Sequence, residues 1–350
     1  MNALHIVVAG AGGNTGSHLL PHLARLNAVR RLTLVDPDVY ETGNLGVQNI
    51  DALDVGRAKA AAQAEKLLRI REDLEVTAFE ERIEDVPRGL LRCDLFVSCL
   101  DSRRARQHLN EIAWRLGTPW IDCGVLGSQG LVRVNAYVTE DDAPCLECSW
   151  SAGKGGDYSL LEQEYLCAAG YDADFPSMAS SALGGLAASL LAIEIEKFLQ
   201  GDGANGLASR QLVFDAGHRV IQLTAERRNP WCRFDHRTWT LEPLPWNPAA
   251  VTVREALSVL GSLQVDGHHF VSELVCPGCG ARRNVARLNR PLARCAACKR
   301  RMVTAGFGSI ERLEHGFAGL FLYRTLAEAG IREGDILSNG SCHRLVAGAA

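Results

Sequence analysis

A glycine-rich turn directly behind an apolar run constrains the fold of this chain more than any other feature. Residues 4–9 have the composition of a buried strand, and the sequence GAGGNTG of residues 10–16, with Gly10, Gly12 and Gly13, follows at once. Glycines at such a turn let the backbone approach a phosphate closely, and the N-terminus of the next helix supplies aligned N–H groups and a favourable dipole. This part of the chain therefore predicts a phosphate-binding site.

A second strand, over residues 32–35, ends at Asp36, whose carboxylate is placed to accept hydrogen bonds from ribose hydroxyls. The glycine spacing differs from the usual dinucleotide pattern. Counting G-x-G-x-x-G from Gly10 puts Thr15 at the third glycine position, and Gly16 arrives one residue late. These residues alone leave NAD, FAD and ATP open as ligands, and they also leave open a purely structural use of the glycines.

About 245 residues alternate strands and helices, as in a doubly wound, mostly parallel α/β sheet. Expected strands cover residues 4–9, 32–35, 74–79, 94–99, 120–123 and 131–138, and expected helices cover residues 17–26, 55–71, 103–116 and 177–193. Residues 149–175 have few periodic apolar positions and predict a long, functional loop. Pro243, Pro245 and Pro248 mark a boundary, which predicts one domain over residues 1–245 and a small α+β domain over residues 246–350.

The bulk composition excludes several classes of protein. The formal net charge of −4 gives a general nucleic-acid-binding role no electrostatic support. The N-terminus shows no secretory signal, and residues 177–193 are too rich in small residues to predict a membrane span, so no membrane partner is expected. Twelve cysteines in such a chain predict a reducing, cytoplasmic location with metal sites and no disulfide framework.

The clearest metal signal lies near the C-terminus. Cys276-x-x-Cys279 and Cys295-x-x-Cys298 are separated by a span typical of a self-contained zinc ribbon. We therefore expect one structural Zn²⁺ ion in the C-terminal domain.

Several further motifs follow the glycine turn in a fixed order. They are Asp36-Pro-Asp38-Val-Tyr-Glu-Thr-Gly-Asn44-Leu-Gly-Val47-Gln48, Gly56-Arg-Ala-Lys59-Ala60, Cys99-Leu-Asp101-Ser102 with Arg106 and Asn110, Gly124-x-x-Gly127-x-x-Gly130, and Cys145-Leu-Glu-Cys148. Over residues 4 to 240 this collinear series resembles the ThiF/MoeB/HesA adenylyltransferases, the bacterial relatives of ubiquitin-activating enzymes. The resemblance implies a Rossmann-like fold.

The resemblance also implies a reaction, in which a carboxylate attacks the α-phosphate of ATP and releases pyrophosphate. Both reactants are anions, so catalysis would consist chiefly of positioning and charge neutralisation. By resemblance, Asp101 would hold Mg²⁺ against the phosphates and Lys59 would contact them. The remaining implied ligand-binding residues are Asp36 and Asp38 for ribose or metal, and Asn44 and Gln48 for the nucleotide pocket. Without the resemblance, Lys59 could equally be a solvated charge on an Ala-rich helix, and Asp101 a helix cap.

Two departures from the family pattern remove cations from this anion-rich site. Val47 stands where the family has a phosphate-contacting arginine. We also expect the chain to lack the N-terminal helix whose arginine, in the family, reaches a partner's ATP site. Arg57, Arg103 or Arg106 could compensate, or a partner chain could supply an arginine. Arg106 is the preferred substitute, because it lies about one helical turn beyond Asp101.

The resemblance further divides the cysteines by role. The family completes its zinc site near the end of the adenylation domain, where this chain has Cys232-x-x-x-His236, so Cys145, Cys148, Cys232 and His236 are expected to form a second Zn²⁺ site. An alternative is that the Cys145 pair joins one ribbon pair. Cys167 stands where family members place a cysteine that forms a thioester or persulfide, which makes it a candidate nucleophile; the alternative is a packing residue.

We therefore expect a zinc-bearing activating enzyme that uses ATP and Mg²⁺ to adenylate the C-terminus of a ubiquitin-like protein. A homodimer, or else a heterodimer, and a conjugating enzyme as partner fit this expectation. The alternatives are an adenylyltransferase that tailors a peptide or small molecule, and a nucleotide-binding scaffold with weak catalysis. An NAD oxidoreductase ranks last, because it leaves Asp101 unexplained.

Overall fold

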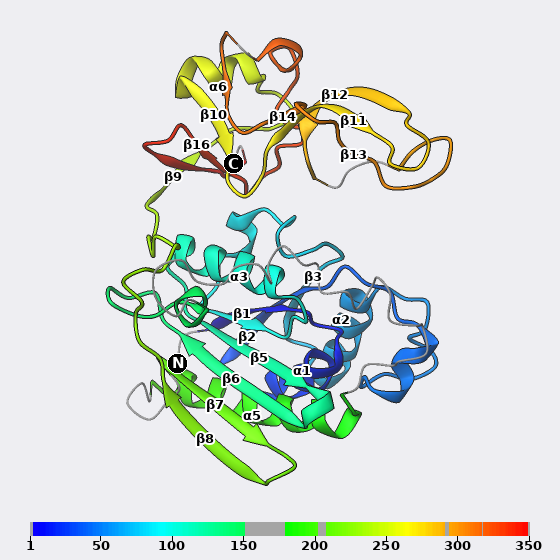
Figure 1. Cartoon of the computed structure of the whole chain (residues 1–350), viewed down its shortest axis with the longest axis vertical. Coiled ribbons are helices and arrows are strands. Elements are labelled where there is room, and N and C mark those ends of the chain that lie inside the picture. The colour runs from blue at the N-terminus through cyan, green and yellow to red at the C-terminus, as the bar shows by residue number, and fades with distance from the viewer. Residues whose placement is uncertain (1–2, 151–178, 202–207, 291–293, 317, 349–350) are drawn as a thin grey trace. The chain divides into compact units, whose positions relative to one another are not determined.

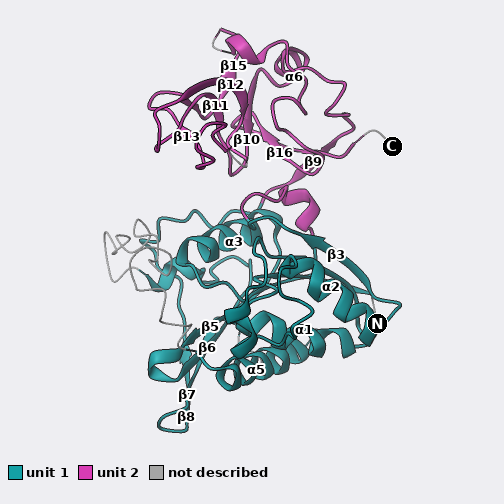
Figure 2. Ribbon diagram, turned by 90° about the vertical axis from the view of Figure 1, so that its right-hand side faces the viewer, with its two compact units in different colours: residues 1–83, 93–238 teal, residues 84–92, 239–350 magenta. Residues whose placement is uncertain are grey.

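The computed structural model describes residues 3–150, 179–201, 208–290, 294–316 and 318–348 of the chain. It divides into two compact units, shown in different colours in Figure 2. The first comprises Met1–Ile83 and Cys93–Thr238, and the second comprises Glu84–Arg92 and Trp239–Ala350. The short segment 84–92 thus belongs to the second unit although its sequence neighbours on both sides belong to the first.

The first unit is built on an eight-stranded sheet with the order β3-β2-β1-β4-β5-β6-β7-β8 (Figure 1). Its strands are β1 (Leu4–Ala9), β2 (Val29–Val35), β3 (Glu75–Phe79), β4 (Leu95–Ser98), β5 (Trp120–Leu126), β6 (Leu131–Tyr137), β7 (Arg210–Asp215) and β8 (Val220–Ala225). The five strands from β3 to β5 are parallel, and β6, β7 and β8 are added antiparallel. This confirms the predicted Rossmann-like, mostly parallel sheet.

Helices cover both faces of this sheet (Figure 1). They are α1 (Asn14–Arg25), α2 (Lys59–Ile70), α3 (Arg103–Leu116) and α5 (Ser181–Leu199). Helix α1 packs against α2 and α5 on one face, whereas α3 packs on β4 and β5 from the other. Buried aliphatic side chains of the sheet, α1 and α5 form the main core, which stabilises the fold by removing apolar surface from water. No helix among the described residues is long and apolar enough to span a membrane.

The two helices nearest the predicted phosphate site begin at positions that the sequence did not indicate. Helix α1 begins at Asn14, three residues before the predicted start, because Gly13 serves as its N-cap. Gly16 lies inside the helix, where a Cβ atom would come within 2.2 Å of the Gly10 carbonyl oxygen. Helix α2 begins only at Lys59, because an isolated bridge from Val39 to Ala58 holds the preceding residues in a turn.

In its described residues, the second unit contains two small sheets and one α-helix, α6 (Val253–Leu260). The first sheet has the order β15-β10-β16-β17-β9 and the second the order β12-β11-β13, with β14 also paired to β11. The strands are β9 (Leu241–Leu244), β10 (Ser262–Val265), β11 (Phe270–Val275), β12 (Arg282–Leu288), β13 (Val303–Thr304), β14 (Ser309–Ile310), β15 (Leu313–Glu314), β16 (Ile336–Ser338) and β17 (His343–Val346). Thr252 and Glu255 form a capping box that fixes the start of α6.

Segment 84–92 is an integral part of the second unit. The Arg88 guanidinium forms a buried ion pair with Asp266, and the two side chains are 7% and 11% exposed. The Gly89 amide donates to the Gly334 carbonyl at 2.8 Å. A Cβ atom on Gly89 would lie 2.7 Å from the Gly334 carbonyl oxygen and 2.2 Å from the Leu345 side chain, so only glycine fits there. The second unit therefore requires this piece of the N-terminal half of the chain for its own packing.

Candidate functional site

The glycine turn lies at the carboxyl end of β1, where the neighbouring strands β2 and β4 diverge. Gly10 has a φ of +77°, and a Cβ atom there would lie 2.5 Å from the Cys99 carbonyl oxygen. A Cβ atom on Gly12 would lie 2.4 Å from the Cβ of Lys59. The turn is thus packed between the residues that lead into Asp101 and the first residue of α2. Ligands of open α/β sheets bind at such a switch point.

Gly13 differs from its two neighbours, because the nearest atom to a Cβ built on it is the Gly10 carbonyl oxygen at 3.4 Å. Protein packing therefore does not by itself demand glycine here. A bare backbone at the N-cap of α1 leaves room for a phosphate to approach the helix N-terminus.

Asp36 fixes the glycine turn to the end of β2. Its Oδ2 accepts from the Gly12 amide at 2.8 Å and its Oδ1 from the Asp38 amide at 3.1 Å. Burial raises the pKa of this carboxyl, and the Gly12 hydrogen bond and the Lys59 charge oppose that shift. Each oxygen keeps a second lone pair, which suits acceptance from ribose hydroxyls.

Lys59 is a buried cation at the start of α2. Its Nζ forms an ion pair with Asp38 Oδ2 at 3.2 Å and lies 5.7 Å from the centre of the Tyr40 ring. The lysine side chain is only 9% exposed, so this arrangement is not that of a freely solvated charge. The packing of Lys59 against Gly12 places it beside the candidate phosphate turn.

Asp101 follows β4 and stands exposed at the end of that strand. The next residue, Ser102, caps α3 by accepting from the Ala105 amide at 3.3 Å, so the capping role falls to Ser102 rather than to Asp101. An exposed carboxylate at the carboxyl edge of the sheet is a suitable ligand for a hard cation such as Mg²⁺.

Segment 42–50 contains two more predicted residues. Asn44 caps a short helical turn, because its Oδ1 accepts from the Glu41 amide at 2.8 Å. Gln48 Oε1 is buried and, within the described residues, has no hydrogen-bond partner. Because buried polar atoms are normally paired, this orphaned acceptor indicates a place for a polar ligand. Val47 is half-buried at the end of the turn.

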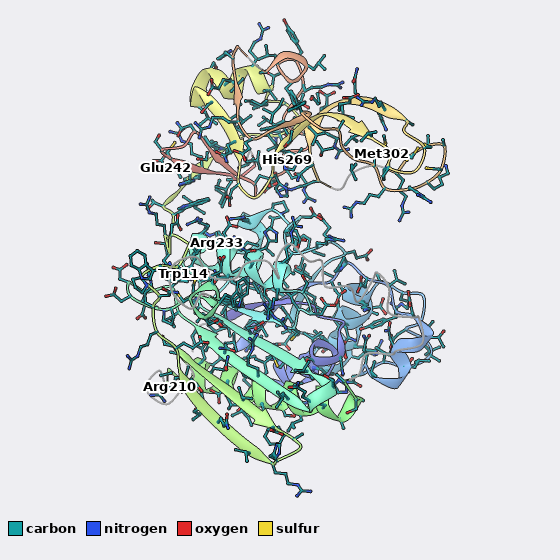
Figure 3. The ribbon with its side chains drawn as sticks, in the orientation of Figure 1. Trp114, Arg210, Arg233, Glu242, His269 and Met302 are labelled. Atoms are coloured by element: carbon teal, nitrogen blue, oxygen red, sulfur yellow. The ribbon has the colours of Figure 1, made fainter. Side chains whose placement is uncertain are left out.

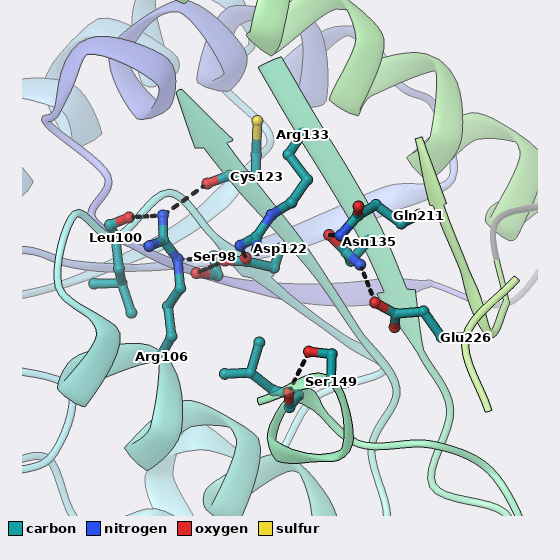
Figure 4. A network of polar contacts seen from close by, with 11 residues as sticks. Ser98, Leu100, Arg106, Asp122, Cys123, Arg133, Asn135, Ser149, Gln211 and Glu226 are labelled. Atoms are coloured by element: carbon teal, nitrogen blue, oxygen red, sulfur yellow. Dashed lines mark hydrogen bonds and ion pairs between the residues drawn. The ribbon is translucent and has the colours of Figure 1, made fainter. Parts of the chain in front are cut away.

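Arg106 belongs to a buried network that the sequence did not reveal (Figure 4). The fully buried carboxylate of Asp122 accepts from Arg106 Nε at 2.9 Å, from Arg133 at 2.7 Å and from Ser98 Oγ at 2.7 Å. Arg106 also donates to the Leu100 and Cys123 carbonyl oxygens. The Arg106 side chain therefore braces the residue before Asp101. Such a place suits a positioning residue better than a phosphate ligand.

The other two arginines considered as substitutes for the cation missing at Val47 differ in their contacts. Arg57 forms an ion pair with Glu65. Arg103 is half-buried at the first position of α3, and no carboxylate partner is found for it in the described part of the chain. Of the three candidates, Arg103 is therefore the one whose charge the described residues leave available.

The first predicted metal site is assembled from two distant parts of the first unit. Cys145, Cys148, Cys232 and His236 bring their ligand atoms within 4.8 Å of one another. The Sγ atom of Cys145 lies 3.8 Å from that of Cys148 and 3.7 Å from that of Cys232. Ligands bound tetrahedrally at the Zn–S distance of about 2.3 Å lie about 3.8 Å apart, so the spacing fits Zn²⁺.

Contacts around His236 orient its ring toward this cluster. Nδ1 lies 2.7 Å from the Phe234 carbonyl oxygen, so it acts as the donor and leaves Nε2 as the ligand atom, 3.3 Å from Cys148 Sγ. The ring packs edge-on against Trp114 with centroids 4.9 Å apart, and Trp114 is labelled in Figure 3. The structure thus favours this grouping over one that pairs Cys145 with the ribbon.

The second cluster lies in the second unit, where Cys276, Cys279, Cys295 and Cys298 also gather within 4.8 Å. Its two halves repeat one geometry. The Gly280 amide donates a hydrogen bond to the Cys276 carbonyl oxygen, and the Lys299 amide donates one to the Cys295 carbonyl oxygen; both N–O distances are 2.9 Å. The Cys276 amide donates to Ala281 and the Cys295 amide to Arg300, both at 2.8 Å. Two such matched turns are the expected frame of a zinc ribbon.

Two separate clusters predict two zinc ions per chain. Elemental analysis of freshly purified protein should give about two equivalents, and Cys276→Ser should retain about one. The variant should unfold only in the second unit, because each cluster is confined to its own unit. A Cys123→Ser variant serves as control, since Cys123 lies outside both clusters. One equivalent or fewer in the unmodified protein would contradict the assignment.

The remaining described cysteines of the first unit are unsuited to nucleophilic attack. Burial raises the pKa of the Cys93 and Cys99 thiols well above their usual range and that of Cys123 to about 12. A thiol must ionise to attack, so these three read as packing residues. Cys167 lies outside the described residues, and its role as a nucleophile stays a prediction.

Residues 1–234 match the ThiF family. Mouse (Mus musculus) adenylyltransferase and sulfurtransferase MOCS3 is 28% identical over 233 residues, which is 66% of this chain and 47% of that protein. Escherichia coli (strain K12) sulfur carrier protein ThiS adenylyltransferase is 28% identical over 41% of this chain and 57% of that protein. The chain thus spans about half the length of these curated relatives.

Solved structures show the same fold. A crystal structure of E. coli MccB with ATP superimposes with a TM-score of 0.52 at 22% identity, and the match covers 66% of this chain and 65% of that one. A second MccB structure, with succinimide, gives a TM-score of 0.54 at 20% identity and covers 66% of each chain.

Proposed function

Because the chain belongs to the ThiF family, we propose that it is an adenylyltransferase that activates the C-terminal carboxylate of a small protein. A carboxylate oxygen attacks the α-phosphorus of ATP, the bond from that phosphorus to the bridging oxygen breaks, and pyrophosphate leaves. The observation that carries the proposal is the glycine turn packed directly between the approach to Asp101 and Lys59. Phosphates held at this turn would lie between a metal-binding carboxylate and a buried cation.

The described residues fit ATP and Mg²⁺. The open backbone at Gly13 and the helix N-terminus behind it suit a phosphate, and the orphaned Gln48 Oε1 offers an acceptor to a polar group of the nucleotide. Mg²⁺ bound at Asp101 would neutralise phosphate charge. Arg106 positions the Asp101 carboxylate by holding the carbonyl oxygen of the preceding residue, Leu100. Asp38 keeps Lys59 in place through their ion pair.

Arg103 is the cation that we propose in place of the arginine missing at Val47. It lies two residues beyond Asp101 at the N-terminus of α3, and within the described residues its charge is not engaged by a carboxylate. Arg106 acts as a positioning residue, because its guanidinium already serves Asp122 and two carbonyl oxygens.

The edge of the sheet supports a protein as the substrate. Strand β8 is the last strand of the order, and all six of its residues are exposed. Val220, Ile221 and Leu223 are 43%, 56% and 61% exposed, and no described strand pairs with the outer edge of β8. An exposed apolar edge strand is a typical docking site for another polypeptide. A small-molecule carboxylate would leave this surface unexplained.

The names of the relatives point to two substrate classes. SUMO-activating enzyme subunit 2 of Dictyostelium discoideum and the ThiS adenylyltransferase are named for small carrier proteins. The MccB structures, which include a complex with N-formylated MccA, belong to a Microcin C7 biosynthetic enzyme. We therefore keep a tailoring adenylyltransferase as the second candidate. A ubiquitin-like carrier is the first, because of the apolar edge at β8.

We expect the chain with ATP and Mg²⁺ to convert purified ubiquitin-like carriers to AMP adducts at their C-terminus, detected by intact-protein mass spectrometry. Synthetic peptides matching only the last seven carrier residues should react at least tenfold more slowly, because they cannot cover β8. A Leu223→Asp variant should reduce carrier adenylation but spare the peptide reaction. Carrier and peptide reacting equally would favour the tailoring enzyme, and nucleotide binding without any adduct would favour the scaffold.

The same assay addresses the proposed thioester at Cys167. A reducing-agent-sensitive adduct between chain and carrier should form in the parent and be lost in a Cys167→Ala variant, whereas pyrophosphate release should persist. If the adduct still formed in the Cys167→Ala variant, another cysteine would be the nucleophile.

A further inference from the structure

The second unit contains a segment whose charge is opposite to that of the rest of the chain. Residues 274–310 contain eight cations, Arg282, Arg283, Arg287, Arg290, Arg294, Lys299, Arg300 and Arg301, and no Asp or Glu. The remaining sequence therefore holds 37 − 8 = 29 Lys and Arg against 41 Asp and Glu, a net charge of −12. The overall charge of −4, from which no nucleic-acid partner was expected, is therefore the sum of +8 in residues 274–310 and −12 in the rest of the chain.

Most of these cations stand around one metal-ligand cluster. Six of them, Arg282, Arg283, Arg294, Lys299, Arg300 and Arg301, are exposed, and all six lie within four residues of a ribbon cysteine. We call the exposed residues of 277–284 and 294–301 the ribbon tip. The four cysteine sulfurs lie within 4.8 Å of one another, so both stretches of the ribbon tip surround the same point.

Few of these charges are neutralised within the protein. Arg282 pairs with Glu273 at 3.0 Å, and Arg290 is buried in an ion pair with Asp335. Among the described residues, no carboxylate lies within ion-pair distance of the other five exposed cations. A zinc ion with four thiolates carries a charge of −2, so five cations leave an excess of about three positive charges at the ribbon tip.

The backbone conformation of Lys299 gives a second, independent indication that the ribbon tip uses a positive charge at this position. Gly280 and Lys299 occupy matching positions directly after a cysteine in the two turns, with φ values of +72° and +61°. Glycine adopts this conformation freely, whereas a lysine does so only against steric cost. The fold alone would favour glycine at both positions. A strained residue of this kind points to a use of its side chain.

The remaining surface of the ribbon tip favours a phosphate backbone over a protein partner. Besides the metal-ligand residues Cys279 and Cys298, its other exposed residues are small or polar: Pro277, Gly278, Gly280, Ala281, Asn284, Ala296 and Ala297. Protein interfaces are typically anchored by Trp, Tyr and Arg, and the ribbon tip has arginines but no aromatic side chain. The exposed apolar residues of the same segment, Val303 and Phe307, lie outside the ribbon tip. Small residues between arginines instead allow a polyanion to approach closely, and guanidinium groups bind phosphate oxygens in pairs.

We propose that the ribbon tip binds the phosphate backbone of a nucleic acid without sequence preference, a role separate from adenylation and independent of it. The affinity would arise from release of counterions by the exposed arginines and Lys299. The interaction would hold the enzyme near a polynucleotide and needs no change in the first unit.

The test uses the full-length, zinc-loaded protein and a fluorescein-labelled 20-nucleotide oligouridylate, followed by fluorescence anisotropy. Five phosphate contacts to a single strand predict a slope of log K against log salt of about −3.5, or a loss of about 100-fold in affinity between 50 and 200 mM KCl. The triple variant R283Q/R300Q/R301Q should reduce the slope by about 2 and weaken binding more than tenfold at 50 mM KCl. A control triple variant, R69Q/R210Q/R227Q, removes three exposed arginines of the first unit and should bind within twofold of the parent.

Zinc content of about two equivalents in each variant verifies that the ribbon is folded. If the triple variant loses zinc, K299G decides the matter, since glycine fits the left-handed conformation: it should retain zinc and reduce the slope by about 0.7. Binding that is unaffected by either substitution would overturn the proposal. So would displacement of the RNA by polyglutamate at equal charge concentration, which would indicate an acidic protein as the partner instead.

Discussion

Asp101→Asn should reduce ATP–pyrophosphate exchange by a factor of about 1,000 while leaving the protein folded. The substitution keeps the size of the exposed side chain at the end of β4 but removes its negative charge. Mg²⁺ would then bind less firmly at the turn, and the charge that develops on the phosphates would not be neutralised. Losses of about 100- to 1,000-fold are typical when one electrostatic group of this kind is removed.

The measurement is isotope exchange between pyrophosphate and ATP with a carrier that gives exchange in the parent. A parallel titration of Mn²⁺ with ATP should show weaker metal binding. Glu72→Gln is the matched control, because Glu72 is an exposed carboxylate elsewhere in the first unit, and it should leave exchange unchanged. An Asp101→Asn protein that exchanges within threefold of the parent would exclude this carboxylate from the reaction.

Asp122→Asn should lower the free energy of unfolding of the first unit by about 3–5 kcal/mol. Asp122 is completely buried and is the only carboxylate that the structure shows contacting Arg106 and Arg133 among the described residues. Removing one partner of a buried ion pair leaves charge uncompensated at low dielectric, which costs far more than losing a surface pair. Urea unfolding should show a lower midpoint with an unchanged slope.

Glu75→Gln provides the comparison, because Glu75 pairs with Arg31 on the surface, where the two side chains are 75% and 57% exposed. Such a pair should contribute no more than about 1 kcal/mol. Equal losses in the two variants would show that the Asp122 network is not a buried charge centre. Folded Asp122→Asn protein, tested at low temperature, should also show slower exchange, since Arg106 would no longer be held against the Leu100 carbonyl.

The same network predicts a dependence of stability on pH. Burial alone would raise the pKa of Asp122, but Arg106, Arg133 and the Ser98 hydroxyl overcome this effect and hold it below its usual value. The stabilisation is therefore present above the unfolded pKa of about 3.9 and is lost as the pH falls through the lower folded value. The parent should lose stability below about pH 4, and this part of the loss should be absent from the Asp122→Asn protein.

Much of the fold follows from short stretches of sequence. Apolar runs with the period of a strand, the glycine turn at residues 10–16 and the Ala-rich helix before residue 71 each depend on neighbours a few residues away. The order of strands and helices along the chain can therefore be predicted from the sequence alone, and this order indicates the doubly wound sheet. The zinc ribbon can be predicted in the same way, because each C-x-x-C pair forms a local turn around a metal.

Other features were decided only by tertiary structure. Asp122 and Arg106 are sixteen residues apart and meet because β5 lies beside the strand that leads into α3. No local pattern distinguishes an arginine that will meet a buried carboxylate from one that will face a phosphate, so the sequence ranked Arg106 above Arg103. Likewise, segment 84–92 joins the second unit through Asp266 and Gly334, contacts that span more than 150 residues. The sequence by itself determined elements, turns and metal-ligand pairs; the pairing of charges required the folded arrangement, because electrostatic energy depends on distance and burial rather than on position in the chain.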